Sequence, residues 1–153
     1  LDEVTFEDDI GPSSIDGSLL FDRVISGDTS SEVASSLAGA TLSISDGGLT
    51  AALSDFSISA ARTPSGLTLG AADETFRLDL SILDTPLDGT IKVPFTGPET
   101  TDLQAGSVEM KAQDNGTLLL SIIDSSGTVR LELDSDGDGT IDDSLLTQWD
   151  DLD

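Results

Sequence analysis

Carboxylates at alternate positions near the end of the chain are the residues best suited to chemistry. They lie in the run Asp134-Ser-Asp136-Gly-Asp138-Gly-Thr140-Ile-Asp142-Asp143. A hard cation such as Ca²⁺ takes about six to eight oxygen ligands, and a short loop of alternating acids closed by glycine provides them. The run therefore predicts one Ca²⁺ ion as the cofactor, and the predicted metal ligands are Asp134, Asp136, Asp138, the carbonyl of Thr140, and Asp142.

This run resembles the first nine positions of an EF-hand loop, and also the aspartate-rich calcium loops of dockerin-like and other secreted bacterial modules. The resemblance covers about ten residues and stops at the twelfth position, where an EF-hand has a bidentate Glu and this chain has Leu145. Residues 128–133 alternate as a strand does, so a helix-loop-helix sensor is not expected. The last ligand is expected from Asp143, water or a distant acid. The alternative is a polar Asp-Gly turn that holds no ion.

Residues 128–152 also resemble the end of secreted bacterial β-rich surface proteins, in which a strand, an Asp-Gly calcium-type loop and a tryptophan close the domain. That resemblance implies a location outside the cell. A chain with no cysteine that starts at Leu1 rather than Met agrees with an exported product whose signal peptide is removed. No apolar run of about 18 residues occurs, so no membrane-spanning segment is expected.

The charge of the chain excludes whole classes of partner. Thirty acids face six bases, which gives a formal net charge of −24. Nucleic acids and anionic lipids are bound through Lys and Arg, so this chain is expected to bind neither. The other interpretation of the acids is a solvated surface suited to a salty medium, where screening over about 8–10 Å blunts their repulsion.

Hydrophobic residues recur with a period of two, which predicts strands. The predicted strands cover residues 17–25, 40–45, 48–53, 56–62, 76–82, 91–95, 108–112, 118–123 and 129–133. Turn residues separate them at Asp46-Gly47-Gly48, Asp88-Gly89, Asp114-Asn115-Gly116 and Ser125-Ser126-Gly127. We therefore expect a single all-β domain over residues 1–153, built as an antiparallel β-sandwich or an extended β-meander.

Several residues carry finer expectations. The phase of the pattern slips at Asp55, which predicts a bulge or tight bend. Asn115-Gly116 predicts a type I′ turn, and Pro94 predicts an edge strand or a strand end. Residues 118–123 are apolar on both sides and predict a central strand covered on both faces. The predicted core consists of Leu78, Leu80, Leu118, Leu120, Ile122 and Leu131.

At most one or two short helices are expected. Thr29-Ser-Ser-Glu32 has the spacing of a capping box before Val33, with Gly39 as a stop, and a serine-rich loop is the alternative. The only tryptophan, Trp149, is expected to close the core beside Leu145, Leu146 and Leu152.

The residue types argue against an enzyme. With no His and no Cys, the usual catalytic triads, dyads and zinc sites are unavailable, and no phosphate-binding or dinucleotide motif occurs. A glycosidase that uses two carboxylates is the remote alternative. We expect an extracellular, calcium-binding structural or interaction protein, or else a module that binds glycan or protein.

The structural protein could be a subunit of a surface fibre or matrix. Residues 1–10 contain a strand-like segment, Val4-Thr5-Phe6, set apart by Gly11-Pro12. Such a detached strand can pair with the edge of a neighbouring subunit, which would give self-assembly. The alternative is an ordinary edge strand of the chain's own sheet.

Overall fold

The computed structural model describes residues 4–8, 11–17, 20–26, 32–46, 49–63, 66–98 and 103–149. Within these residues the chain is all-β and contains no α-helix, which confirms the predicted fold class, and no helix there could cross a membrane. The strands are β1 (Val4–Asp8), β2 (Gly11–Gly17), β3 (Leu20–Ser26), β4 (Glu32–Asp46), β5 (Leu49–Thr63), β6 (Gly66–Leu69), β7 (Thr75–Leu80), β8 (Leu87–Gly97), β9 (Ala105–Lys111), β10 (Thr117–Ile122), β11 (Thr128–Asp134) and β12 (Asp143–Gln148).

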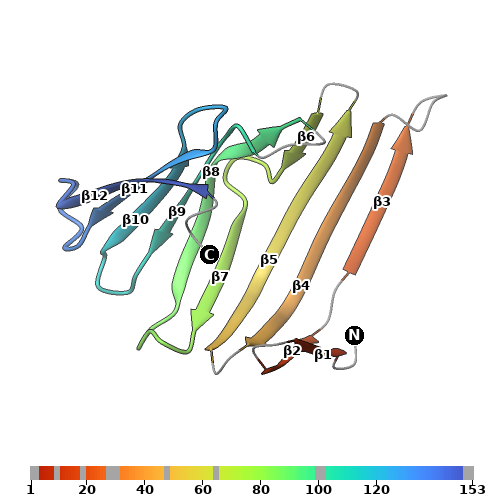
Figure 1. Ribbon diagram of the computed structural model, residues 1–153, viewed down its shortest axis with the longest axis horizontal. Helices are drawn as coiled ribbons and strands as arrows, with labels where there is room; N and C mark the ends of the chain where they lie inside the picture. The colour runs from red at the N-terminus through yellow and green to blue at the C-terminus, as the bar shows by residue number, and fades with distance from the viewer. Residues whose placement is uncertain are drawn as a thin grey trace.

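The twelve strands form one antiparallel sheet (Figure 1). From β8 to β12 each strand pairs with the next strand of the chain, so this half is a plain meander. In the other half β3 pairs with β4, while β7 pairs with both β5 and β8. Of the two predicted architectures the described residues therefore adopt the extended meander, and no second sheet covers it.

The N-terminal strand belongs to this sheet. β1 pairs with β2 in the register Val4↔Ile15, and Gly11 opens β2 opposite Asp8. The segment Val4-Thr5-Phe6 is thus not detached in the chain. Since β1 ends the strand order, it is an edge strand, as the alternative interpretation predicted.

Two predicted turns are confirmed in position. Asn115 lies between β9 and β10 with φ of 75°, and Gly127 lies between β10 and β11 with φ of 78°. The predicted type I′ turn at Asn115-Gly116 is wrong, because only Asn115 has positive φ and its amide donates to the carbonyl of Ala112, three residues back. One left-handed residue after a tight turn is the alternative hairpin geometry. The turn at Gly47-Gly48 lies outside the described residues.

The turn predicted at Asp88-Gly89 is wrong, because both residues lie inside β8. Gly89 pairs with Phe76 across the strands, and a Cβ atom on Gly89 would overlap the phenyl ring. Gly106 has the same relation to the ring of Phe95. Glycine in these strands therefore makes room for an aromatic ring and does not reverse the chain.

Pro94 does not mark an edge or a strand end. It lies within β8, which pairs with β6 and β7 on one side and with β9 on the other. The register between β8 and β9 shifts from Ile91 to Val93 and again from Val93 to Thr96. Pro94 therefore sits in an irregular stretch of the ladder, where no backbone donor is needed.

The expected bend at Asp55 is confirmed. Its φ is 51°, and the pairing of β4 with β5 passes from Thr41↔Ser54 to Gly39↔Phe56 without a pair at Asp55. The helix expected over residues 29–39 is wrong where the chain is described, because Glu32 to Gly39 belongs to β4. Pairing of β4 with β3 and β5 replaces the local capping preference. Thr29 to Ser31 lie outside the described residues.

The core is smaller than predicted. Among the residues whose burial the structure describes, the buried apolar side chains are Phe56, Ile91, Ile122 and Val129. Of the six predicted core residues only Ile122 is buried, and the other five are half-buried. β10 is central, since β9 and β11 flank it, but its two faces are not covered. Because no second layer lies opposite among the described residues, a side chain of this sheet is screened only by its neighbours on the same face, and most of them keep part of their surface exposed.

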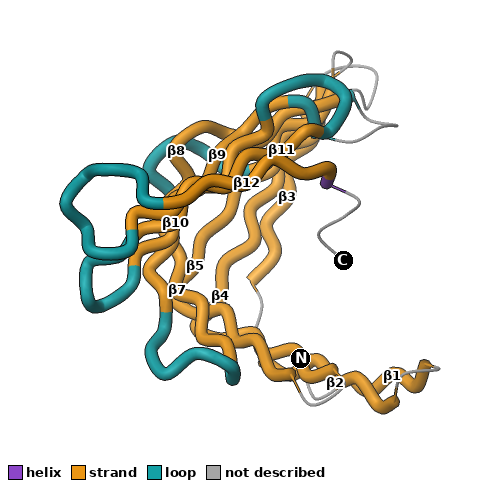
Figure 2. Tube along the Cα trace, turned by 60° about the vertical axis from the view of Figure 1, so that its left-hand side comes forward, coloured by secondary structure: helices purple, strands orange, loops and turns teal. Residues whose placement is uncertain are grey.

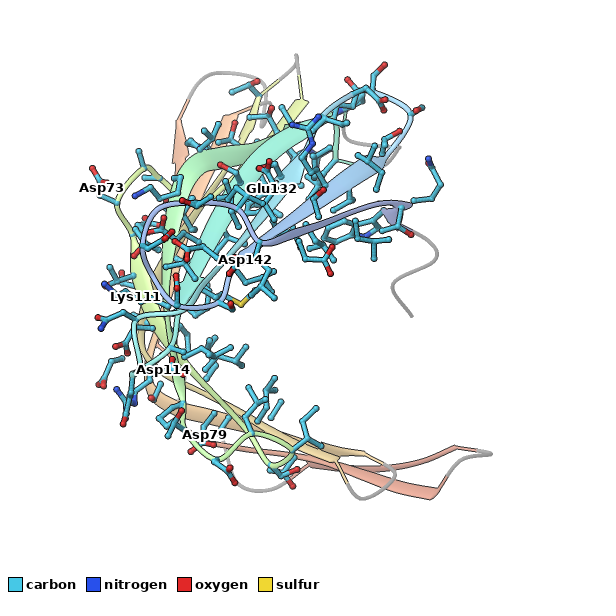
Figure 3. The ribbon with its side chains drawn as sticks, turned by 90° about the vertical axis from the view of Figure 1, so that its left-hand side faces the viewer. Asp73, Asp79, Lys111, Asp114, Glu132 and Asp142 are labelled. Carbon is cyan, nitrogen blue, oxygen red and sulfur yellow. The ribbon has the colours of Figure 1, made fainter. Side chains whose placement is uncertain are left out.

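The sheet is strongly curved, as Figures 2 and 3 show. In Figure 3 the labelled side chains of Asp79 and Lys111 lie on its outer, convex side. The register places the alternate residues Leu78, Met110, Leu118 and Leu131 on the opposite, inner side. The curved sheet thus has a charged outer face and an apolar inner face.

Candidate metal centre

The predicted calcium loop joins β11 to β12 and is closed at its base by a backbone hydrogen bond. The amide of Asp142 donates to the carbonyl of Leu133 over 2.8 Å. Strands, not helices, flank the loop, as predicted. The loop lies against the β9–β10 turn, because a Cβ atom on Gly137 would overlap Asn115. The neighbouring hairpin therefore supports the loop from one side.

Asp134 anchors the loop from the end of β11. Its side chain is buried, and the residue is only 5% exposed. Its Oδ1 accepts a hydrogen bond from the amide of Gly137 (2.7 Å), and its Oδ2 accepts one from the amide of Gly139 (2.9 Å). Both glycines have positive φ, 74° and 88°, which turns their amides inward. Each carboxylate oxygen keeps a further lone pair for a ligand.

Asp136 and Asp138 continue the same winding. Asp136 Oδ1 accepts from the amide of Asp138 (3.1 Å), and Asp138 Oδ1 accepts from the amide of Thr140 (2.7 Å). One carboxylate oxygen from each of Asp134, Asp136 and Asp138 lies within 4.8 Å of the others. Oxygens on opposite sides of a Ca²⁺ ion, each about 2.4 Å away, are about 4.8 Å apart. The three carboxylates could therefore hold one metal ion.

The other two predicted ligands have different surroundings. Asp142 Oδ2 accepts from the hydroxyl and the amide of Ser135, and these bonds, the hydroxyl first, lower the pKa of Asp142. Asp142 thus ties the end of the loop to its start and lies outside the group of three. The amide of Thr140 donates to Asp138. That the carbonyl of Thr140 is a metal ligand stays a prediction. Asp143 accepts from the amide of Ser144, and Leu145 lies in β12.

Ser135 and Asn115 were missed in the sequence. Ser135 holds Asp142, and Asn115 supports Gly137. The serine in the second position of the run offered a signal, because a hydroxyl within reach of a backbone or carboxylate favours local hydrogen bonds. Contact between the two loops could not be read from the sequence, because it follows from the pairing of β9, β10 and β11.

A second acidic turn joins β10 to β11. Asp124 Oδ1 accepts from the amide (2.9 Å) and the hydroxyl (2.7 Å) of Ser126 and from the amide of Thr128 (3.2 Å). Hydrogen bonds from Ser126 and Thr128, those involving their side chains first, lower the pKa of Asp124 to about 2. One oxygen of this carboxylate thus receives three donors from its own turn.

The core position expected for Trp149 is wrong. Trp149 is 40% exposed, and its predicted neighbours Leu145 and Leu146 are 55% and 60% exposed. Its backbone amide donates to the carbonyl of Gly127 over 2.9 Å, which holds the chain but leaves the indole at the surface. Leu152, the remaining predicted neighbour, lies outside the described residues.

Comparison with family models, with curated proteins and with solved structures finds no match to this chain. The likeness of the loop to EF-hand and dockerin loops therefore rests on its own residues and geometry.

Proposed function

We propose that this chain is an extracellular, calcium-binding structural or interaction protein whose loop at residues 134–142 holds one Ca²⁺ ion. The observation that supports this most is the convergence of three carboxylates within 4.8 Å around a buried Asp134. An ion there would bind the folded loop and fix the junction of β11 with the edge strand β12. Extracellular calcium is millimolar, so a site with Kd of about 10⁻⁴–10⁻³ M is substantially filled.

Thermal unfolding in CaCl₂ and in NaCl of equal ionic strength tests the ion. At tenfold saturation, binding to the folded state alone adds about 1.4 kcal/mol to the free energy of unfolding. For a domain of this size that raises Tm by roughly 3–6 °C. We expect Ca²⁺ to exceed NaCl by this amount and Mg²⁺ to do less, because Mg²⁺ demands tighter octahedral geometry.

Asp136→Asn should remove most of the calcium-specific rise in Tm. Asp114→Asn is the matched control, since Asp114 is an exposed acid in the adjoining turn but outside the group of three. Equal shifts in CaCl₂ and NaCl for the unmodified protein would show that the loop is only an acidic turn.

The exposed side chains of β12, and that of Trp149 directly after it, favour a module that binds glycan or protein as the second candidate. Leu145, Leu146 and Trp149 are all at least 40% exposed, and an exposed indole can stack on a sugar ring. If the chain is a glycan-binding module, the fluorescence emission of Trp149 should be quenched or shifted when oligosaccharides are titrated into the protein. Unchanged emission with a broad set of glycans leaves protein as the partner class.

A role as an assembly subunit would use the other end of the sheet. β1 ends the strand order, so its outer edge is open to a strand from a neighbouring subunit. Fibres that lengthen with concentration, and that disappear when residues 1–8 are removed, are the expected result. A chain that stays the same size after this deletion argues against it.

A further inference from the structure

The inner face of the meander is apolar and lacks a covering layer among the described residues. The face is made by alternate residues of five strands, namely Leu78, Leu80, Val108, Met110, Leu118, Leu120, Ile122, Val129, Leu131, Leu133 and Leu145. Only Ile122 and Val129 are buried, while Leu133 and Leu145 are 40% and 55% exposed. A sheet with one apolar face is stable when a second layer covers that face.

The exposed surface area of the chain is larger than that of a compact monomer of the same mass. The chain exposes 9547 Å². A folded monomer of 15.8 kDa is expected to expose about 7,300 Å². The excess is about 2,200 Å², whereas a stable interface buries about 800 Å² on each partner. The chain as a whole thus exposes more surface than a compact monomer of its mass, and the excess is larger than the area that one stable interface buries on each partner.

The distribution of charge allows two inner faces to meet. The outer face carries the ion pairs Arg77–Asp88, Lys92–Glu109 and Arg130–Glu132. Asp143 is an acid on the inner face, but it lies at the rim of that face, where it pairs with Leu133. Contact between two inner faces therefore leaves the acids pointing to solvent, where salt screens their repulsion over about 8–10 Å.

The shape of the inner face favours a broad surface over a small ligand. The hollow bounded by Leu118, Leu131, Leu133 and Leu145 has a volume of about 80 Å³. Sites for small molecules usually enclose about 300 Å³ or more. A layer of side chains from another sheet needs no deep cavity, because two sheets pack across about 10 Å.

We propose that the inner face is the interface of a closed homodimer, in which a second copy of this chain supplies the missing layer. Its contacts are isologous, with the same apolar residues on both sides. Two curved sheets that cross at a steep angle can each lie in the concavity of the other. This dimer does not depend on calcium or on the outer edge of β1, so it stands apart from the function proposed above.

Sedimentation velocity over about 1–200 µM protein in about 0.5 M NaCl tests the interface. The unmodified chain should sediment as a dimer. Leu145 and Leu146 are adjacent in β12, similarly exposed, and on opposite faces, since Leu145 pairs with Leu131 and Leu146 with Arg130. Leu145→Glu should raise the dimer Kd at least about tenfold, and Leu146→Glu should leave it unchanged.

A second pair tests the centre of the face. Leu120 points inward and Leu119, next to it in β10, pairs with Glu109 and Glu132 on the outer face. Leu120→Glu should abolish the dimer and Leu119→Glu should keep it, with folding checked by circular dichroism. If Leu120→Glu does not fold, the comparison of Leu145→Glu with Leu146→Glu still tests the interface, because both of these residues are exposed. A monomer at every concentration overturns the proposal, and so does equal weakening by Leu145→Glu and Leu146→Glu, which indicates pairing through the β12 edge.

Discussion

The two connections of β11 use aspartate in opposite ways. At one end, Asp124 accepts three hydrogen bonds on one oxygen from Ser126 and Thr128, so the turn satisfies its own charge. At the other end, Asp134, Asp136 and Asp138 share four amide donors among six oxygens. Asp136 and Asp138 each receive one amide on one oxygen, whereas one oxygen of Asp124 receives three donors.

The two connections differ in how many hydrogen-bond donors each carboxylate receives, and not only in how many acids they contain. A carboxylate that receives several N–H and O–H bonds is stable as an anion without any other partner. Three carboxylates within 4.8 Å with spare lone pairs repel one another until a cation joins them. One connection therefore gathers three donors on a single carboxylate, while the other brings together three carboxylates that could hold a metal ion.

Removing the first acid of each connection gives the largest expected contrast. Asp134→Ala leaves the amides of Gly137 and Gly139 without their acceptor beside a buried position, which should cost about 2 kcal/mol even without calcium. Asp124→Ala removes an exposed carboxylate whose donors can turn to water, so its effect should be smaller. Chemical denaturation of both variants measures this, and equal losses would remove the contrast.

Replacing one glycine by alanine in each connection should show that the two connections differ in how closely they are packed. Gly127 and Gly137 have nearly the same φ, 78° and 74°, so alanine at either site should cost about 1–2 kcal/mol in backbone strain. A Cβ atom at Gly127 only touches Trp149, whereas one at Gly137 overlaps the backbone of Asn115. Gly137→Ala should therefore destabilise the protein more than Gly127→Ala. The same loss at both sites would mean that the β9–β10 turn does not support the loop.

The hydroxyls of Ser126 and Ser135 offer a matched pair with a smaller effect. Each donates its amide and its hydroxyl to one aspartate oxygen, on Asp124 and Asp142 respectively. Ser135→Ala should weaken Ca²⁺ binding by about tenfold, since groups that orient a metal loop act on affinity. Ser126→Ala should leave calcium affinity unchanged. Isothermal titration calorimetry compares them, and a weakening by both variants would point to a general loss of stability.

The sequence predicted the elements better than their environment. Alternation and turn residues located most strands from β5 to β11, because side-chain period and backbone preference are local properties. The same local signals misplaced Asp88-Gly89 and the helix after Thr29, where pairing with distant strands decides the structure. Burial of Leu120 or Trp149 could not be predicted, because it depends on whether a second layer exists.

For the candidate site, too, the sequence predicted the acids of the loop but not how they are arranged. The spacing of Asp134, Asp136 and Asp138 is a property of the chain, and the structure brings these three together. The same spacing predicted Asp142 as a ligand, and this stays a prediction, because Ser135 donates to its Oδ2 alone. Only the folded loop shows which acids converge and which ones fasten its ends.

The smallest effect is a difference in titration between the two connections. The lowered pKa of Asp124, about 2, means that its ionised form is favoured by folding. Its stabilising contribution is complete above the ordinary aspartate pKa of about 3.9 and is lost as the pH falls from there toward 2. Asp142 also has a lowered pKa, so its contribution falls in the same direction.

Carboxyl-carbon NMR titration of the folded protein checks both groups. Asp124 should titrate near pH 2, and Ser126→Ala should move its midpoint up toward the ordinary value, because the Ser126 hydroxyl is the largest cause of the shift. Added calcium should leave the Asp124 midpoint in place, since its turn has no free oxygen cluster. A calcium-dependent midpoint for Asp124 would mean that the two ends of β11 are coupled and that the contrast between them is wrong.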